Sequence, residues 1–360
     1  MFRTGKLIRE TLRGMPATAG TSEVARMMRE GRLLDATARI QERLGGGLPG
    51  GGLPGGVTMP SMTGMSSMPG MPTPRTGSPT GRAPGAVTRG SAQGLAYRLY
   101  VPTTLQAGAP LLVMLHGGTQ DAETFAAATG MDEAAEAAGV LVAYPEQSRS
   151  ANAMGYWNWF RPGDQARDAG EPGMIAAVTR EVMAAHDADP GRVAVAGFSA
   201  GGAMAAVMGA SYPDLYCGAG VHSGLPHRAA SDVGSAFAAM SSPPRTVADA
   251  GPVPLVVVHG DADRTVAPAC GEAVVRSALT RAGRIEPVRT DGRVDGGRTW
   301  TRERWSEPGG RVLAESWTVH GMGHAWSGGR AGGSYADPAG LDAGAAMLAF
   351  FGFTADPTLE

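Results

Sequence analysis

The sequence predicts an α/β fold built on a doubly wound, mostly parallel sheet, with a helical N-terminal extension and a disordered linker before it. Three observations predict this arrangement. From about residue 93 onward, short apolar runs alternate with alanine-rich, helix-like stretches. Residues 45–92 are rich in Gly, Pro, Met and Ser and show no periodicity. Residues 20–44 carry apolar side chains at nearly helical spacing.

These composition shifts divide the chain into three parts. We expect a helical extension over 1–44, a disordered linker over 45–92 and an α/β domain over 93–360. The linker cannot bury enough apolar surface to offset the entropy lost on ordering. The apolar stripe of 20–44 has two interpretations, a docking surface or a helix packed on the main domain, and packing is the commoner use of such a stripe.

Overall composition excludes several classes of function. The 31 basic and 33 acidic side chains nearly balance, which argues against a nucleic-acid binder. No run approaches the roughly 20 apolar residues of a transmembrane segment. The first residues lack the apolar core of a secretory signal, so the sequence as given favours a cytoplasmic location. Without CxxC, HExxH or a close His/Asp cluster, we expect no metal and no other cofactor.

The expected elements of the α/β domain follow one another in regular alternation. Continuous apolar runs are typical of strands that are covered on both faces, and proline suits a first helical turn. The expected strands are 96–102, 111–116, 140–145, 193–197, 216–224, 255–260 and 312–321. The expected helices include 131–139, one opening at 171 and one over 340–352.

A single G-x-S-x-G motif, Gly197 to Gly201, lies where a predicted strand turns into a predicted helix. This context is typical of a nucleophile elbow, in which Ser199 sits in a strained turn and glycines leave room for neighbouring backbone. With 55 glycines in the chain a chance match is conceivable, and its alternative is a plain Ser-Gly turn at a helix start. The strand and helix around the motif favour the elbow.

A nucleophilic serine needs a histidine base that is oriented by a carboxylate. In this architecture the chain order is serine, acid, histidine, which leaves His320 and His324 as candidate bases. We favour His324, in a glycine-rich loop, and expect a structural role for His320 at the end of an apolar strand. Asp263 is the favoured acid because it lies deeper in its loop, and Asp261 is the alternative.

An oxyanion that forms during acyl transfer needs two backbone N–H donors. One is expected from Ala200, directly after the nucleophile, and the second from the loop after an early strand. That loop reads "LHGGTQ", so Gly118 and Thr119 are the candidates for the second donor.

Several stretches together resemble the polyhydroxybutyrate (PHB) depolymerase family of serine esterases, which is similar to feruloyl and acetylxylan esterases. They include "LLVMLHGGTQ", "YWNWF", "VAVAGFSAGGAMAA", "HGDADRTV" and "GMGHAWSGG", and the resemblance spans about 94–352. It implies an α/β-hydrolase fold with nucleophile, acid and base at Ser199, Asp263 and His324.

Two positions depart from this family. Its members often have cysteines where this chain has Gly118 and Tyr156. If those cysteines pair in the relatives, the pair is absent here, which fits a reducing compartment although many resembling esterases are extracellular. Three aromatic side chains, Trp157, Trp159 and Trp326, are candidates for lining the substrate cleft, with core packing as the alternative.

The leading hypothesis is therefore a serine esterase that acts through an acyl-enzyme on 3-hydroxyalkanoate polyester or oligomers. A feruloyl, acetylxylan or generic short-chain esterase is the alternative within the same chemistry. A granule-associated binding protein that retains the fold is the alternative from another class. Residues 20–44 are the candidate for granule contact or self-association.

Overall fold

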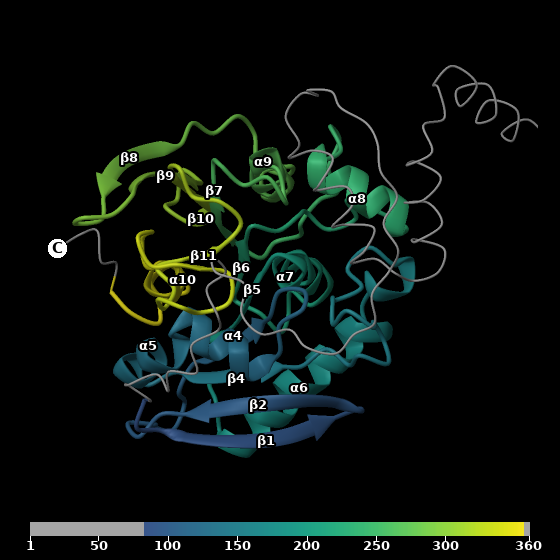
Figure 1. Cartoon of the computed structure of the whole chain (residues 1–360), viewed down its shortest axis with the longest axis vertical. Helices are drawn as coiled ribbons and strands as arrows, with labels where there is room; N and C mark the ends of the chain where they lie inside the picture. The colour runs from purple at the N-terminus through teal and green to yellow at the C-terminus, as the bar shows by residue number, and fades with distance from the viewer. Residues whose placement is uncertain (1–82, 356–360) are drawn as a thin grey trace, which may run out of the picture. The chain divides into compact units, whose positions relative to one another are not determined.

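The computed structural model describes residues 83–355, which lie within one compact unit. The expected extension over 1–44, the candidate contact stripe at 20–44 and the linker up to residue 82 lie outside the described residues. The unit is built on a ten-stranded sheet (Figure 1). Its strands are β1 Ala86–Ala92, β2 Leu95–Val101, β3 Leu111–Leu115, β4 Leu141–Pro145, β5 Val193–Phe198, β6 Gly218–His222, β7 Leu255–Gly260, β8 Val288–Arg293, β9 Thr299–Ser306 and β10 Val312–Val319.

The strand order is β1-β2-β4-β3-β5-β6-β7-β10-β9-β8. The six strands from β4 to β10 in this order pair in parallel. The two strands at either end pair antiparallel, so β1 and β2 form one rim and β9 and β8 the other (Figure 1). The parallel centre confirms the predicted doubly wound, mostly parallel sheet.

Helices cover both faces of the sheet. They are α4 Ala122–Thr129, α5 Met131–Ala138, α6 Gly170–His186, α7 Ala200–Ser211, α8 Val233–Ser241, α9 Pro268–Ala278 and α10 Ala343–Phe350, with a 3₁₀ turn η1 Pro162–Asp164. The all-apolar strand β3 shows why two layers form. Leu111 and Val113 pack in one hydrophobic cluster with α6 and α7, whereas Leu112 and Met114 pack in the other with α4, α5 and α10. Alternate residues of one buried strand thus supply both cores.

Strand β1 lies before residue 93, within the segment expected to be linker. Ala86–Ala92 form strand β1, which pairs along its whole length with β2. Its sequence, AVTRGSA, lacks the apolar run of a buried strand because it is a mostly solvent-facing edge strand. Gly90 faces Tyr97 across the pair, where a Cβ would lie 2.3 Å from the tyrosine ring. Pairing with β2, rather than local propensity, orders this segment.

A two-stranded sheet, β11 Trp326–Ser327 with β12 Ala336–Asp337, follows β10. Strands β8 and β9 were also not predicted from the sequence, because they are polar and lie at the exposed rim of the sheet. Within residues 83–355, no helix is long and apolar enough to cross a membrane.

Candidate active site

The elbow at Ser199 connects β5 to α7. Ser199 has φ 55° and ψ −117°, a backbone conformation that residues with a Cβ rarely adopt. A Cβ on Gly201 would lie 2.0 Å from the Leu115 carbonyl oxygen, and one on Gly197 would lie 2.4 Å from Gly201 backbone atoms. The two glycines therefore let strand, turn and helix approach closely enough to hold Ser199 at the tip.

The side chains of Ser199, His324 and Asp263 meet at the carboxyl edge of the sheet. His324 Nε2 lies 2.9 Å from Ser199 Oγ, and His324 Nδ1 lies 2.7 Å from Asp263 Oδ2. The three residues follow β5, β7 and β10, so the parallel strand directions bring together groups that are up to 125 residues apart. Because a carboxylate faces Nδ1, that nitrogen carries the proton and Nε2 accepts the serine O–H.

The Asp263 carboxylate is buried and heavily hydrogen-bonded. Its Oδ1 accepts the backbone N–H groups of Thr265 at 2.8 Å and Val266 at 2.9 Å, and its Oδ2 also lies 3.4 Å from His259 Nε2. Burial pushes the pKa of Asp263 upward, but the hydrogen bonds from His259, His324 and the backbone outweigh it and hold the pKa well below its ordinary value. The group is therefore ionised at neutral pH.

The alternative acid and base pair with each other instead. His320 Nδ1 lies 2.8 Å from Asp261 Oδ2, and His320 Nε2 lies 3.0 Å from Thr301 Oγ1. Asp261 Oδ1 accepts the Gly321 N–H at 2.6 Å. This pair ties the loop after β7 to the loop after β10, and it makes no hydrogen bond to Ser199 among the described residues.

The candidate oxyanion donors are not equivalent. Ala200 is the first residue of α7, so its N–H has no intrahelical acceptor. The Thr119 N–H is already engaged, donating to the Met154 carbonyl at 3.1 Å. The Gly118 N–H makes no backbone hydrogen bond within the described part of the chain. This geometry favours Ala200 and Gly118 over Thr119.

The sequence is similar to that of a known protein family. The sequence profile of the family described as "Esterase PHB depolymerase" matches residues 95–301. The chain belongs to this family. The match includes Ser199 and Asp263 and ends before His324.

Two curated relatives of this family member and one solved structure support the placement. Poly(3-hydroxyalkanoate) depolymerase C of Paucimonas lemoignei is 35% identical over 239 residues, which are 62% of this chain and 57% of the relative. Feruloyl esterase B of Neurospora crassa is 32% identical over 150 residues, 41% of this chain and 50% of the relative. The chain thus spans 57% of the length of the first relative and 50% of that of the second. An acetyl xylan esterase structure from Aspergillus awamori covers 75% of this chain and 100% of its own, with a TM-score of 0.60 at 18% identity, which shows the α/β-hydrolase fold.

Gly118 and Tyr156, the two positions at which the resemblance implies cysteines in relatives, are neighbours in space. A Cβ on Gly118 would lie 2.0 Å from the Tyr156 ring. The tyrosine ring therefore occupies the space beside residue 118, and only glycine leaves it room.

A buried polar network anchors the loop that carries Gly118. His116 Nε2 accepts the Gln147 N–H at 3.0 Å, and Trp157 Nε1 donates to the His116 carbonyl at 3.2 Å. Burial lowers the pKa of His116 to about 4, so the ring is neutral and Nδ1–H donates to the Gly117 carbonyl at 2.8 Å. Glu171 supports this network and was not recognised from the sequence, where it marks only a first helical turn.

Glu171 is a buried carboxylate that is 2% exposed. It accepts the Asn158 backbone N–H at 2.7 Å and also hydrogen-bonds the side-chain amides of Asn158 and Gln147. Burial raises the pKa of Glu171 to about 7, although these hydrogen bonds oppose the shift. The carboxylate thus links Asn158 to Gln147, whose backbone N–H donates to His116.

The structure does not place the predicted tryptophans on an open cleft wall. Trp157 is 0% exposed, Trp326 is 1% exposed and Trp159 is 5% exposed, so all three belong to the core. The Trp326 ring stacks on His222 with centroids 4.8 Å apart. Trp157 and Trp159 pack in the cluster that contains α6 and α7, and Trp326 packs in the cluster that contains α4, α5 and α10. Among residues 83–355, Tyr335 is an exposed aromatic residue and lies near His324.

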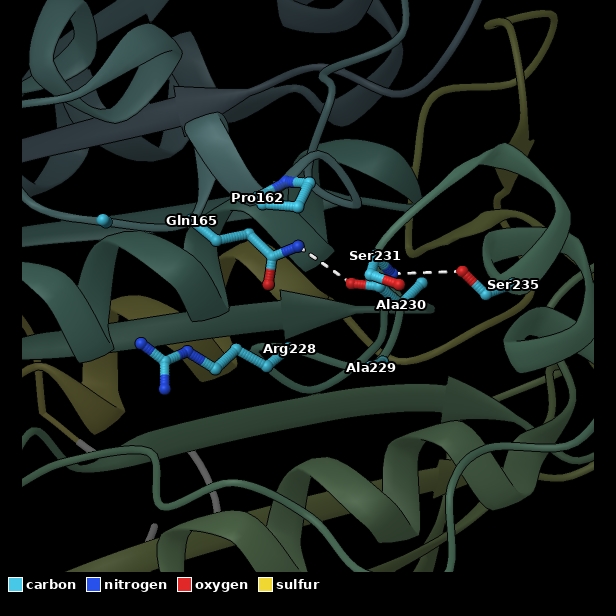
Figure 2. A pocket seen from close by; sticks show the side chains of 8 residues that line it. Pro162, Gln165, Arg228, Ala229, Ala230, Ser231 and Ser235 are labelled. Carbon is cyan, nitrogen blue, oxygen red and sulfur yellow. Dashed lines mark hydrogen bonds between the residues drawn. The ribbon is translucent and has the colours of Figure 1, made fainter. Parts of the chain in front are cut away.

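A hollow of about 550 Å³ lies between η1 and the segment that precedes α8 (Figure 2). Gln165 Nε2 donates to the Ala230 carbonyl at 2.9 Å, and Ser231 N–H donates to Ser235 Oγ at 3.1 Å, as the dashed lines show. Its lining residues are Pro162, Gln165, Ala166, Arg228, Ala229, Ala230, Ser231 and Ser235. None of the residues gathered at Ser199 belongs to this lining. Among residues 83–355, no group of three or more His, Cys, Asp or Glu side chains is arranged to hold a metal ion.

Proposed function

We propose that this protein is a serine esterase in which Ser199, His324 and Asp263 form the catalytic triad. The observation that carries the proposal is the continuous chain from Ser199 Oγ to His324 Nε2 at 2.9 Å and from His324 Nδ1 to Asp263 Oδ2 at 2.7 Å. The strained backbone at Ser199 supports it, because strain of this kind is typical of nucleophile elbows.

The mechanism follows from the donors and acceptors. His324 Nε2 removes the proton of Ser199 as Oγ attacks the ester carbonyl, and Asp263 stabilises the imidazolium that forms. The N–H groups of Ala200 and Gly118 stabilise the oxyanion of the tetrahedral intermediate. Collapse breaks the C–O bond to the alcohol, which leaves with the proton from His324. Water, activated by His324, then attacks the acyl-enzyme and releases the acid.

The proposed substrates are 3-hydroxyalkanoate polyesters or oligomers. Support comes from the named activity of the Paucimonas lemoignei relative, which is 35% identical over 239 residues. The similarity to feruloyl esterase B over 150 residues supports ferulate as an alternative acyl group. The 29% identity over 136 residues to a probable acetylxylan esterase A of Aspergillus fumigatus supports acetate on a plant polysaccharide as another. A short-chain carboxylesterase without a preference between them is the third outcome.

The test combines active-site labelling with a substrate panel. A fluorophosphonate probe should label the wild type and not Ser199→Ala. Initial rates on 3-hydroxybutyrate oligomers, amorphous PHB, methyl ferulate, acetylated xylan and ethyl butyrate then identify the preferred ester. Ser199→Ala should lose at least about 1,000-fold in kcat on the preferred substrate, whereas His320→Ala, the matched histidine control, should stay within about tenfold. Absence of labelling and of turnover on every ester would support the non-catalytic binding protein instead.

A further inference from the structure

Tyr335 is a half-exposed aromatic side chain beside the proposed base. Its exposed fraction is 47%, and Val288 is the other large hydrophobic side chain exposed among the described residues. The Tyr335 ring centroid lies 6.3 Å from that of His324 and 6.1 Å from that of Phe198. The ring therefore lies close enough to His324 to contact a ligand that extends from Ser199 in its direction.

The backbone at Tyr335 is fixed in an unfavourable conformation. Its φ of 53° lies in the left-handed region, which a residue with a Cβ rarely adopts. The Tyr335 carbonyl accepts the Trp326 N–H at 2.6 Å. The preceding carbonyl, of Ser334, accepts Gln120 Nε2 at 3.1 Å. Gln120 Oε1 in turn accepts the Gly117 N–H at 3.0 Å.

These contacts fix the position of the Tyr335 ring relative to His324 and to the loop that carries Gly118. The segment of Tyr335 is linked through Gln120 to the loop that carries Gly118, and the ring itself lies beside His324. Its hydroxyl makes no hydrogen bond to any residue between 83 and 355. Both the ring and the hydroxyl are thus open to a ligand, and the ring supplies the apolar surface.

The reaction chemistry determines which part of an ester lies there. The base returns its proton to the departing alcohol oxygen, so the alcohol portion of the substrate must lie against His324. The oxyanion of the intermediate lies toward the N–H groups of Ala200 and Gly118. We propose that Tyr335 forms the leaving-group subsite and packs against apolar alcohol portions, such as the next unit of a hydroxyalkanoate oligomer. This assignment rests on the proposed esterase function.

The test varies the alcohol and keeps the acyl group constant. Rates on methyl, butyl and hexyl acetate are followed by pH-stat for the wild type, Tyr335→Ala, Tyr335→Phe and Val288→Ala. We expect Tyr335→Ala to lose about tenfold in kcat/KM on hexyl acetate and less than about twofold on methyl acetate. Tyr335→Phe keeps the ring and should match the wild type, as should Val288→Ala, which shortens an exposed residue on β8.

A second measurement does not depend on how much enzyme is active. Methanol and butanol are added together, so that they compete with water for the acyl-enzyme. The ratio of butyl ester to methyl ester among the products is then measured. Because alcoholysis is the reverse of acylation, the incoming alcohol uses the same subsite. Tyr335→Ala should lower the butyl-to-methyl ratio several-fold, and a fall in activity from misfolding would leave the ratio unchanged.

Three outcomes separate the two proposals. An unchanged alcohol preference in Tyr335→Ala, with Ser199→Ala inactive, overturns the subsite and leaves the esterase proposal standing. A changed preference along methyl acetate, butyrate and hexanoate instead assigns the ring to the acyl side and also overturns it. Full activity in Ser199→Ala overturns the proposed function itself, whatever the Tyr335 variants do.

Discussion

Replacing Asp263 by asparagine should abolish most turnover through a change of histidine tautomer. Two backbone N–H groups, from Thr265 and Val266, donate to Oδ1 at 2.8 and 2.9 Å, so an asparagine amide oxygen would take that position. Its NH₂ group would then face His324 Nδ1, where Oδ2 now lies at 2.7 Å. Nδ1 would become an acceptor and the ring proton would move to Nε2, which could no longer accept the serine proton. We expect kcat to fall by about 10⁴-fold, the magnitude associated with the wrong tautomer.

Asp261→Asn is the matched control because Asp261 lies two residues away and hydrogen-bonds the other histidine, His320. Its kcat on the preferred ester should stay within about tenfold of the wild type. Steady-state rates and the rate of fluorophosphonate labelling are measured for both variants, with a thermal melt to establish that each is folded. Equal losses in the two variants, or a loss below about tenfold in Asp263→Asn, would refute the assignment of the acid.

Two further predictions concern the framework of the site. Gly201→Ala should destabilise the fold by about 3 kcal/mol or more in urea unfolding. The reason is that the new Cβ would lie 2.0 Å from the Leu115 carbonyl oxygen, a backbone atom that cannot move aside. A stable, fully active variant would contradict the close backbone approach at the elbow. Burial raises the pKa of Glu171 to about 7, so this group binds its proton more tightly in the folded state than in the unfolded state. Its contribution to stability is therefore greatest at low pH and falls as the pH rises from about 4.5 to about 7. We expect Glu171→Gln to remove up to about 3 kcal/mol of this pH dependence when the free energy of unfolding is compared at pH 5 and pH 8, and an unchanged difference would show that Glu171 does not titrate in this range.

Local patterns in the sequence were sufficient to predict the centre of this fold. The apolar runs that became β3, β5 and β7 are buried along their whole length, and period and composition report such burial directly. The glycines at 197 and 201 likewise report a close backbone approach that no other residue tolerates. The G-x-S-x-G motif then selected Ser199, and chain order limited the candidate bases to His320 and His324. Loop position favoured His324 and Asp263, the residues that the fold brings within hydrogen-bonding distance.

Features that depend on contacts between distant segments had no local signal. Strand β1 is polar and forms only because β2 offers it a complete ladder of partners. The engagement of Thr119 by Met154, and the burial of Trp157 and Trp326, depend on how loops fold over the sheet edge.

By itself, the sequence determined which strands are buried, where the chain must turn sharply and which side chains are the candidates for the chemistry. Only the tertiary structure decided which backbone donors are free, which aromatic rings are covered and that Tyr335 stands exposed beside His324. The physical reason is that periodicity records how each residue meets its immediate neighbours. Exposure at the edge of a sheet, in contrast, is set by loops from several strands packing against one another.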